Sequence, residues 1–152
     1  MVSNDAARDP MSVAFDEAHA AALRGESPTG AALVRDGAVI VRAGNRTREH
    51  CDPTAHAELL ALREAAARLG SERLAGCDLY VTLEPCAMCA GAISHARIRR
   101  LYYAAPDAKG GAVEHGPRFF RQPTCHHAPD VYGGIRESEA AAMLKAFFAA
   151  RR

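Results

Sequence analysis

One set of metal-binding residues constrains this chain more than any other feature. His56-Ala57-Glu58 is followed later in the chain by Pro85-Cys86-Ala87-Met88-Cys89. Zinc binds cysteine thiolates and histidine nitrogens in tetrahedral geometry, and a catalytic zinc site keeps one of its four positions for water. His56, Cys86 and Cys89 supply three ligands, so the fourth position is left open. We therefore predict one catalytic zinc ion per chain, held by these three side chains.

Glu58 is the candidate catalytic group. Two thiolates neutralise the charge of the zinc ion, so water bound there should be less acidic than water on an all-histidine zinc. A nearby base is then needed, and Glu58 lies two positions from His56 without being required as a ligand. We predict that Glu58 carries protons between water and substrate. The alternatives are a solvated helix carboxylate and a structural zinc knot, but no fourth protein ligand is suitably spaced for the knot.

Length and composition indicate one globular domain. The 152 residues, 49% of them apolar, are enough to bury a core of their own. No apolar run approaches the roughly 18 to 20 residues of a membrane span, and the first residues do not resemble a signal peptide. Five cysteines, two of them in Cys-x-x-Cys, argue against a secreted disulfide framework. We expect a soluble, cytoplasmic protein without membrane association, with a flexible leader over residues 1–10 and a single zinc-dependent domain over residues 11–152.

Turn residues and hydrophobic periodicity predict alternating helices and strands. Asp36-Gly37 tolerates the positive φ angles of a two-residue hairpin turn. Pro53 and Pro85 suit helix starts, so the positive ends of two helices should converge on the metal. A long irregular connection is expected over residues 106–129. The expected helices cover residues 12–25, 52–69, a segment beginning at 85, and 137–152, and the expected strands cover 31–35, 38–43, 78–83, 99–104 and 131–135. This order predicts a three-layer α/β domain with a mixed sheet.

The net charge of +1 hides an asymmetry along the chain. Residues 97–152 carry ten Lys or Arg against five Asp or Glu, a net charge of +5, whereas residues 1–96 carry −4. A basic region suits a nucleic-acid partner, although a solvated helix face is the plainer interpretation. Phe147 and Phe148 either pack the last helix or stack on a base.

These motifs resemble the signature of the cytidine deaminase superfamily, whose zinc enzymes act on nucleobases. The longer sequence segments around these motifs are similar to those of the bacterial tRNA adenosine deaminase branch in particular. The similarity covers nearly the whole chain from about Met11. The similar segments are Asp52-Pro-Thr-Ala-His-Ala-Glu58, Tyr80-Val-Thr-Leu-Glu-Pro-Cys-Ala-Met-Cys-Ala-Gly91, Asp107-Ala-Lys-Gly-Gly111, Gly44-Asn-Arg46 and Ala146-Phe-Phe-Ala-Ala-Arg-Arg152.

The resemblance implies a three-layer α/β/α cytidine deaminase-like fold with a central mixed five-stranded sheet. It also implies a homodimer that binds a tRNA anticodon stem-loop and converts the wobble adenosine to inosine, releasing ammonia. The zinc would be held by His56, Cys86 and Cys89, with Glu58 as the proton shuttle. Asn45 and the main-chain N–H of Ala57 would contact the target nucleoside. Asp107 would either cap a turn or position the RNA backbone.

Two segments depart from the sequence pattern of this branch. The branch usually has Glu-Val-Pro-Val-Gly-Ala where this chain has Glu26-Ser27-Pro28-Thr29-Gly30-Ala31. The connection 117–129, with Thr124-Cys-His-His127, is also longer than in that branch.

Two other functions stay open. The first alternative is a deaminase of a free base or nucleoside, such as guanine or cytosine. The second is a catalytically silent zinc-bearing RNA-binding module. The intact Glu58 disfavours that module, and the basic C-terminal third favours an RNA substrate over a free base.

Overall fold

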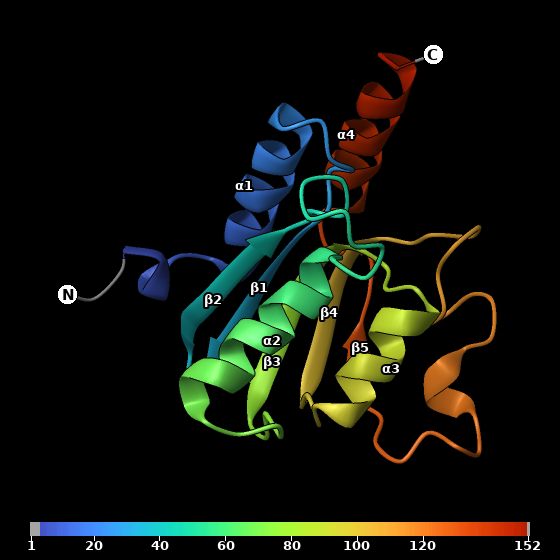
Figure 1. Cartoon of the computed structure of the whole chain (residues 1–152). Helices are drawn as coiled ribbons and strands as arrows, with labels where there is room; N and C mark the ends of the chain where they lie inside the picture. Colours follow the sequence, from blue (N-terminus) through green and yellow to red (C-terminus); the bar gives the residue numbers. More distant parts are fainter. Residues whose placement is uncertain (1–3, 152) are drawn as a thin grey trace.

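The computed structural model describes residues 4–151 of the chain (Figure 1). Five strands form one sheet in the order β2-β1-β3-β4-β5. Strand β1 is antiparallel to both β2 and β3, whereas β3, β4 and β5 are parallel to one another. The strands are β1 Gly30–Arg35, β2 Ala38–Gly44, β3 Cys77–Leu83, β4 Arg100–Ala105 and β5 Asp130–Tyr132; the helices are α1 Pro10–Leu23, α2 Ala57–Leu69, α3 Ala87–His95 and α4 Glu137–Ala149, with short 3-10 helices η1 Asn4–Ala7 and η2 Phe119–Arg121.

Helices cover both faces of the sheet, so the expected three-layer α/β/α fold with a mixed five-stranded sheet is confirmed. Helices α2 and α3 lie on one face and α1 and α4 on the other (Figure 1). The core under α2 and α3 is built around Leu33, Leu79 and Ile93, all with no exposed surface. The core on the opposite face includes Phe15 of α1 and Ala140 of α4. A sheet buried on both faces explains why its central strands are almost continuously apolar.

The predicted hairpin turn is present, because Asp36 and Gly37 adopt φ angles of +50° and +77°. The predicted helix start near residue 52 is wrong. Asp52 instead accepts hydrogen bonds from the main-chain N–H and the hydroxyl of Thr54, at 2.8 and 2.7 Å. Such an Asx-type turn competes with helix formation, so α2 begins only at Ala57. The last helix was expected to reach residue 152 but ends at Ala149. Arg152 itself lies outside the described residues.

Strand directions gather several segments at one edge of the sheet. Because β1 runs opposite to β3, the start of β1 lies beside the end of β3, and the end of β4 lies on the other side of it. The N–H of Gly30 donates to the hydroxyl of Thr82 across this edge at 3.1 Å. The loops that follow β2, β3 and β4 therefore leave the sheet together. Both α2 and α3 begin at this edge, which makes it the place where a site can form.

Part of the N-terminal segment packs on the sheet. The helix Asn4–Ala7 contains Asp5, whose carboxylate accepts a hydrogen bond from Arg42 of β2 at 2.7 Å. This helix lies inside the segment 1–10 that we expected to be a flexible leader. The flexibility of the leader and the domain limits 11–152 stay predictions, and residues 1–3 lie outside the described part. In that part, no helix is both long and apolar enough to cross a bilayer.

Candidate metal centre and active site

His56 and Cys86 occupy equivalent places, each as the N-cap residue of a helix. Both have extended backbone, with φ/ψ of −73°/152° for His56 and −74°/176° for Cys86. Neither side chain caps its own helix, so the imidazole and the thiol are free to turn toward each other. The unpaired N–H groups and positive dipole ends of two first turns favour a thiolate at this place.

The three predicted zinc ligands come together. Nδ1 of His56 lies 3.6 Å from Sγ of Cys86 and 3.6 Å from Sγ of Cys89. All three ligand atoms lie within 4.8 Å of one another. Zinc–sulfur bonds of about 2.3 Å and zinc–nitrogen bonds of about 2.0 Å at tetrahedral angles require a nitrogen–sulfur separation of about 3.5 Å, close to the two distances observed. The donor set and its spacing therefore fit one zinc ion.

Two side chains of ligand type from the connection 117–129 are engaged elsewhere. Sγ of Cys125 lies 3.5 Å from the hydroxyl of Ser94, and the ring of His127 contacts the carbonyl of Ile98 at 2.8 Å. Within residues 4–151 no His, Cys, Asp or Glu joins the group of three as a fourth ligand. The arrangement is therefore that of an open site, and a closed structural zinc knot is disfavoured.

The sulfur groups differ in their pKa values. Hydrogen bonds from Cys89 and His56 lower the pKa of Cys86 to about 4. The hydrogen bond to Cys86, together with burial, raises the pKa of Cys89. The bond to Cys86 also raises the pKa of His56. The Cys86 thiolate is therefore available at neutral pH, the form in which cysteine binds metals.

Glu58 lies beside the metal group as a buried carboxylate. Its exposed fraction is 3%, and burial raises its pKa to about 6. Among the described residues its Oε1 atom is buried without a hydrogen-bond partner. A buried carboxylate oxygen without a partner is unfavourable by itself. It is suited to a molecule that enters the site, such as water or a substrate.

A cavity of about 270 Å³ opens above Glu58 and the metal group. Asn45 and Asp107, predicted to bind substrate, both line it. Asp107 also caps a turn, since its Oδ1 accepts the N–H groups of Lys109 and Gly110 at 3.1 and 2.9 Å. Ala57 is fully buried and is not among the lining residues, so its contact with substrate stays a prediction. The lining consists of Ser27, Thr29, Asn45, Thr47, His56, Glu58, Leu83, Glu84, Cys86, Asp107 and Gly110.

Comparison with known proteins identifies the family. Residues 5–105 match the zinc-binding region of cytidine and deoxycytidylate deaminases. The chain belongs to this deaminase family. The predicted zinc cofactor is thereby confirmed, since the family is zinc-binding and His56, Cys86 and Cys89 could hold one metal ion.

Individual relatives of this deaminase act on more than one kind of substrate. The tRNA-specific adenosine deaminase of Agrobacterium fabrum is 65% identical over 142 residues, which cover 93% of each chain. A solved structure from work on A-to-I editing by tRNA:A34 deaminases has a TM-score of 0.88 and 66% identity, covering 89% of this chain and 98% of that one. The guanine deaminase of Bacillus subtilis has a TM-score of 0.64 and 33% identity, covering 93% and 91%.

Sequence reasoning missed two buried carboxylates of the deaminase that shape the cavity. Glu26 and Glu84 are both 2% exposed. Glu26 accepts the N–H groups of Arg48 and Glu49 at 3.0 and 2.8 Å and so holds the loop that follows Asn45. Glu84 holds the loop that carries Asp107. A charged residue at the end of an apolar strand, immediately before a proline, was the available signal for Glu84.

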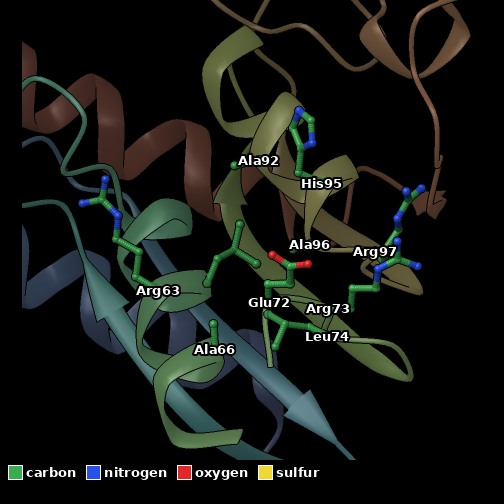
Figure 2. Close-up of a pocket in the computed structure, with 10 residues that line it drawn as sticks. Arg63, Ala66, Glu72, Arg73, Leu74, Ala92, His95, Ala96 and Arg97 are labelled. Carbon is green, nitrogen blue, oxygen red and sulfur yellow. The ribbon is translucent and has the colours of Figure 1, made fainter. Parts of the chain in front are cut away.

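A second depression of the deaminase, of about 420 Å³, shares no residue with the metal-site cavity. It lies between α2 and α3 (Figure 2), with an apolar floor and a charged rim. Glu72, Arg73 and Leu74, from the connection after α2, face the end of α3 across it (Figure 2). It holds no group of metal ligands within the described chain. Its lining consists of Leu62, Arg63, Ala66, Glu72, Arg73, Leu74, Ala92, His95, Ala96 and Arg97.

Proposed function

We propose that this deaminase converts adenosine to inosine at the wobble position of tRNA and releases ammonia. The buried Oε1 of Glu58, which has no hydrogen-bond partner within residues 4–151, lies beside the His56, Cys86 and Cys89 group and carries the chemistry. The 65% identity to a tRNA-specific adenosine deaminase over 93% of both chains supports the choice of substrate. Since tRNA is a cytoplasmic molecule, the proposal includes a cytoplasmic location.

The chemistry needs a polarising metal and a proton carrier. Zinc held by His56, Cys86 and Cys89 would act as a Lewis acid that makes water a better nucleophile. Glu58 accepts the proton of the attacking water and delivers it to ring N1 of adenine, so the ring takes up electrons without becoming an anion. Glu58 then takes the second proton of that water from the hydroxyl now on C6 and passes it to the amine, so the C6–N bond breaks, C6 keeps the oxygen as a carbonyl, and ammonia leaves.

The cavity suits a single base taken out of a stacked loop. In the proposal, the Asn45 amide and the main-chain N–H of Ala57 hold the target nucleoside. Exposed cationic side chains on the two loops beside the cavity, Arg48 and Lys109, would contact phosphates.

An adjoining depression of about 380 Å³ supports RNA binding. It shares Ser27, Leu83 and Asp107 with the metal-site cavity and is also lined by Lys109 and Phe148. Phe148 is 50% exposed, so its ring is available for a neighbouring base of the anticodon loop.

A homodimer is the next part of the proposal, supported by the depression between α2 and α3 (Figure 2). Its rim carries Glu72 together with Arg63, Arg73 and Arg97, so both charge signs occur on one patch. A patch of this kind can pair with its own copy, as a twofold interface requires. Sedimentation equilibrium should give twice the chain mass of 16.2 kDa. Glu72→Arg should shift the distribution toward the monomer, and a wild-type monomer at all concentrations would exclude this part.

The decisive experiment compares two kinds of substrate. The purified deaminase is incubated with an arginine-tRNA anticodon stem-loop and, separately, with a panel of free bases and nucleosides, while inosine and ammonia are measured. A stem-loop with guanosine at the wobble position is the matched control. Inosine from the first stem-loop alone supports the proposal. Ammonia from guanine alone would transfer the assignment to a guanine deaminase, the second candidate, which the 33% identity to the Bacillus subtilis enzyme favours.

A further inference from the structure

We infer that Glu84 is a positioning residue, which fixes the loop 106–116 as one wall of the substrate cavity. This inference rests on the proposed function for the identity of the substrate, but the contacts that support it belong to the chain alone. Glu84 follows β3 directly and precedes the metal ligand Cys86 by two positions. Its side chain has no exposed surface.

The Glu84 carboxylate is surrounded by donors from both ends of this loop. Its Oε1 accepts the N–H of Asp107 at 3.0 Å and lies 2.7 Å from Nδ1 of His115. Its Oε2 accepts three successive N–H groups at 3.1, 3.0 and 3.2 Å, those of Val113, Glu114 and His115. Four main-chain donors, one at Asp107 and three at residues 113–115, therefore close the loop on one anion. Removing that anion would take the acceptor from one buried and three partly buried main-chain hydrogen bonds.

The loop also packs tightly against the carboxylate. A Cβ atom added to Gly111 would lie 2.5 Å from both Cδ and Oε2 of Glu84, so only glycine fits at this position. Next to it, the N–H of Ala112 donates to the carbonyl of Pro85 at 2.9 Å. The same short segment, residues 84–89, thus carries the loop anchor and two metal ligands. The distance between the cavity wall and the metal group is set through this segment.

The cavity wall that Glu84 holds belongs to a different segment of the chain from the proton carrier Glu58. Asp107 and Gly110 line the cavity, and Asp107 is anchored directly through its N–H. Glu58 lies in α2 and His56 is the N-cap of that helix, and within residues 4–151 neither side chain forms a hydrogen bond with this loop. Loss of the anchor should therefore weaken substrate binding more than it slows the chemical step.

Glu84→Gln tests this inference. A glutamine of the same shape can still accept N–H groups with one oxygen, but its NH₂ group then faces a main-chain donor at the other end of the loop. We expect KM for the substrate found in the activity assay to rise about tenfold or more, with kcat within about threefold and one zinc ion per chain retained. Glu114→Gln is the matched control, because it removes a carboxylate from the same loop but keeps its main-chain N–H; its KM should stay within about twofold of wild type.

Amide hydrogen exchange gives a readout that needs no substrate. In Glu84→Gln the N–H groups of Asp107, Val113, Glu114 or His115 should exchange faster, while those of Arg48 and Glu49, held by Glu26, stay unchanged as an internal reference. If no stem-loop is deaminated by the wild type, the proposed function fails, and the exchange data with KM for whichever base is turned over still test the role of Glu84.

Two results would overturn the inference. The first is unchanged exchange and unchanged KM in Glu84→Gln. The second is loss of zinc or of kcat with normal KM, which would assign Glu84 to the metal group instead. If Glu84→Gln does not fold, Gly111→Ala perturbs the same contact from the loop side and should show the same rise in KM with kcat preserved.

Discussion

Nδ1 of His56 lies 3.6 Å from Sγ of Cys86, and each of these residues is the N-cap of a different helix. The two helices leave the same edge of the sheet, so their positive ends meet at the ligand group. A metal site built in this way depends on backbone placement as much as on ligand identity.

Removal of a ligand should abolish zinc binding. In Cys86→Ala, two protein ligands remain, and we expect the zinc content to fall from one ion per chain to nearly none, with a lower Tm. Cys125→Ala, which removes a thiol outside the group, is the control and should keep its zinc. Elemental analysis of the purified proteins measures both. A full equivalent of zinc in Cys86→Ala would show that the ligand set is different.

The substitution Glu58→Gln should remove activity without removing the metal. We expect the rate to fall by about 10² to 10⁴ or more, since a positioned proton carrier contributes about that much. Zinc content should be normal. Tm should not fall, because the buried carboxylate that is replaced has one oxygen without a hydrogen-bond partner among the described residues, and the amide that replaces it is uncharged. Glu64→Gln, on the exposed surface of the same helix, is the control. Wild-type turnover in Glu58→Gln would exclude this role.

Glu26 should make stability depend on pH. Burial would raise its pKa, but hydrogen bonds from the N–H groups of Arg48 and Glu49 and the charge of Arg24 hold the pKa below its ordinary value of 4.5. A lowered folded-state pKa stabilises the fold above the unfolded-state value, and this contribution is lost as the pH falls through the folded-state value. We expect Glu26→Gln to lower the free energy of unfolding by about 1–3 kcal/mol at pH 7.

Urea unfolding of wild type and Glu26→Gln, measured from pH 7 down to pH 3, checks this sign. The difference between the two proteins should shrink on acidification, and Glu49→Gln, an exposed carboxylate of the same loop, should stay close to wild type throughout. A difference that grows toward low pH would contradict the assignment.

Gly30→Ala should be strongly destabilising. A Cβ atom at this position would lie 1.9 Å from the carbonyl oxygen of Ala14 and 2.5 Å from the nitrogen of Ala18. Both are backbone atoms of α1, so the helix would have to move away from β1. We expect a loss of about 3 kcal/mol or more in the free energy of unfolding. Gly91→Ala, with no atom within 4 Å of the added Cβ, should gain up to about 1 kcal/mol from helix propensity.

The sequence predicted the elements well where the signal was local. Asp36-Gly37 marked the hairpin turn, and the helix expected to end at residue 69 does end at Leu69. Boundaries were less certain, because Asp52 forms a side-chain turn with Thr54 that delays the helix to Ala57. This shift changes the site, since His56 becomes an N-cap instead of a residue within the first turn.

The sequence by itself determined the ligand types and marked Glu58 as the candidate proton carrier, because residue chemistry and short spacing identify a metal site without knowledge of distant contacts. Its resemblance to known deaminases indicated the family. Only the tertiary structure decided the cavity around them. Glu26 and Glu84 each hold a loop that lies 22 to 31 positions away, and such contacts leave no periodic signal. The physical reason is that a loop can close on a buried carboxylate only if the strands before it end close together in space. The packing of helices on both faces of the sheet sets the positions of those strand ends.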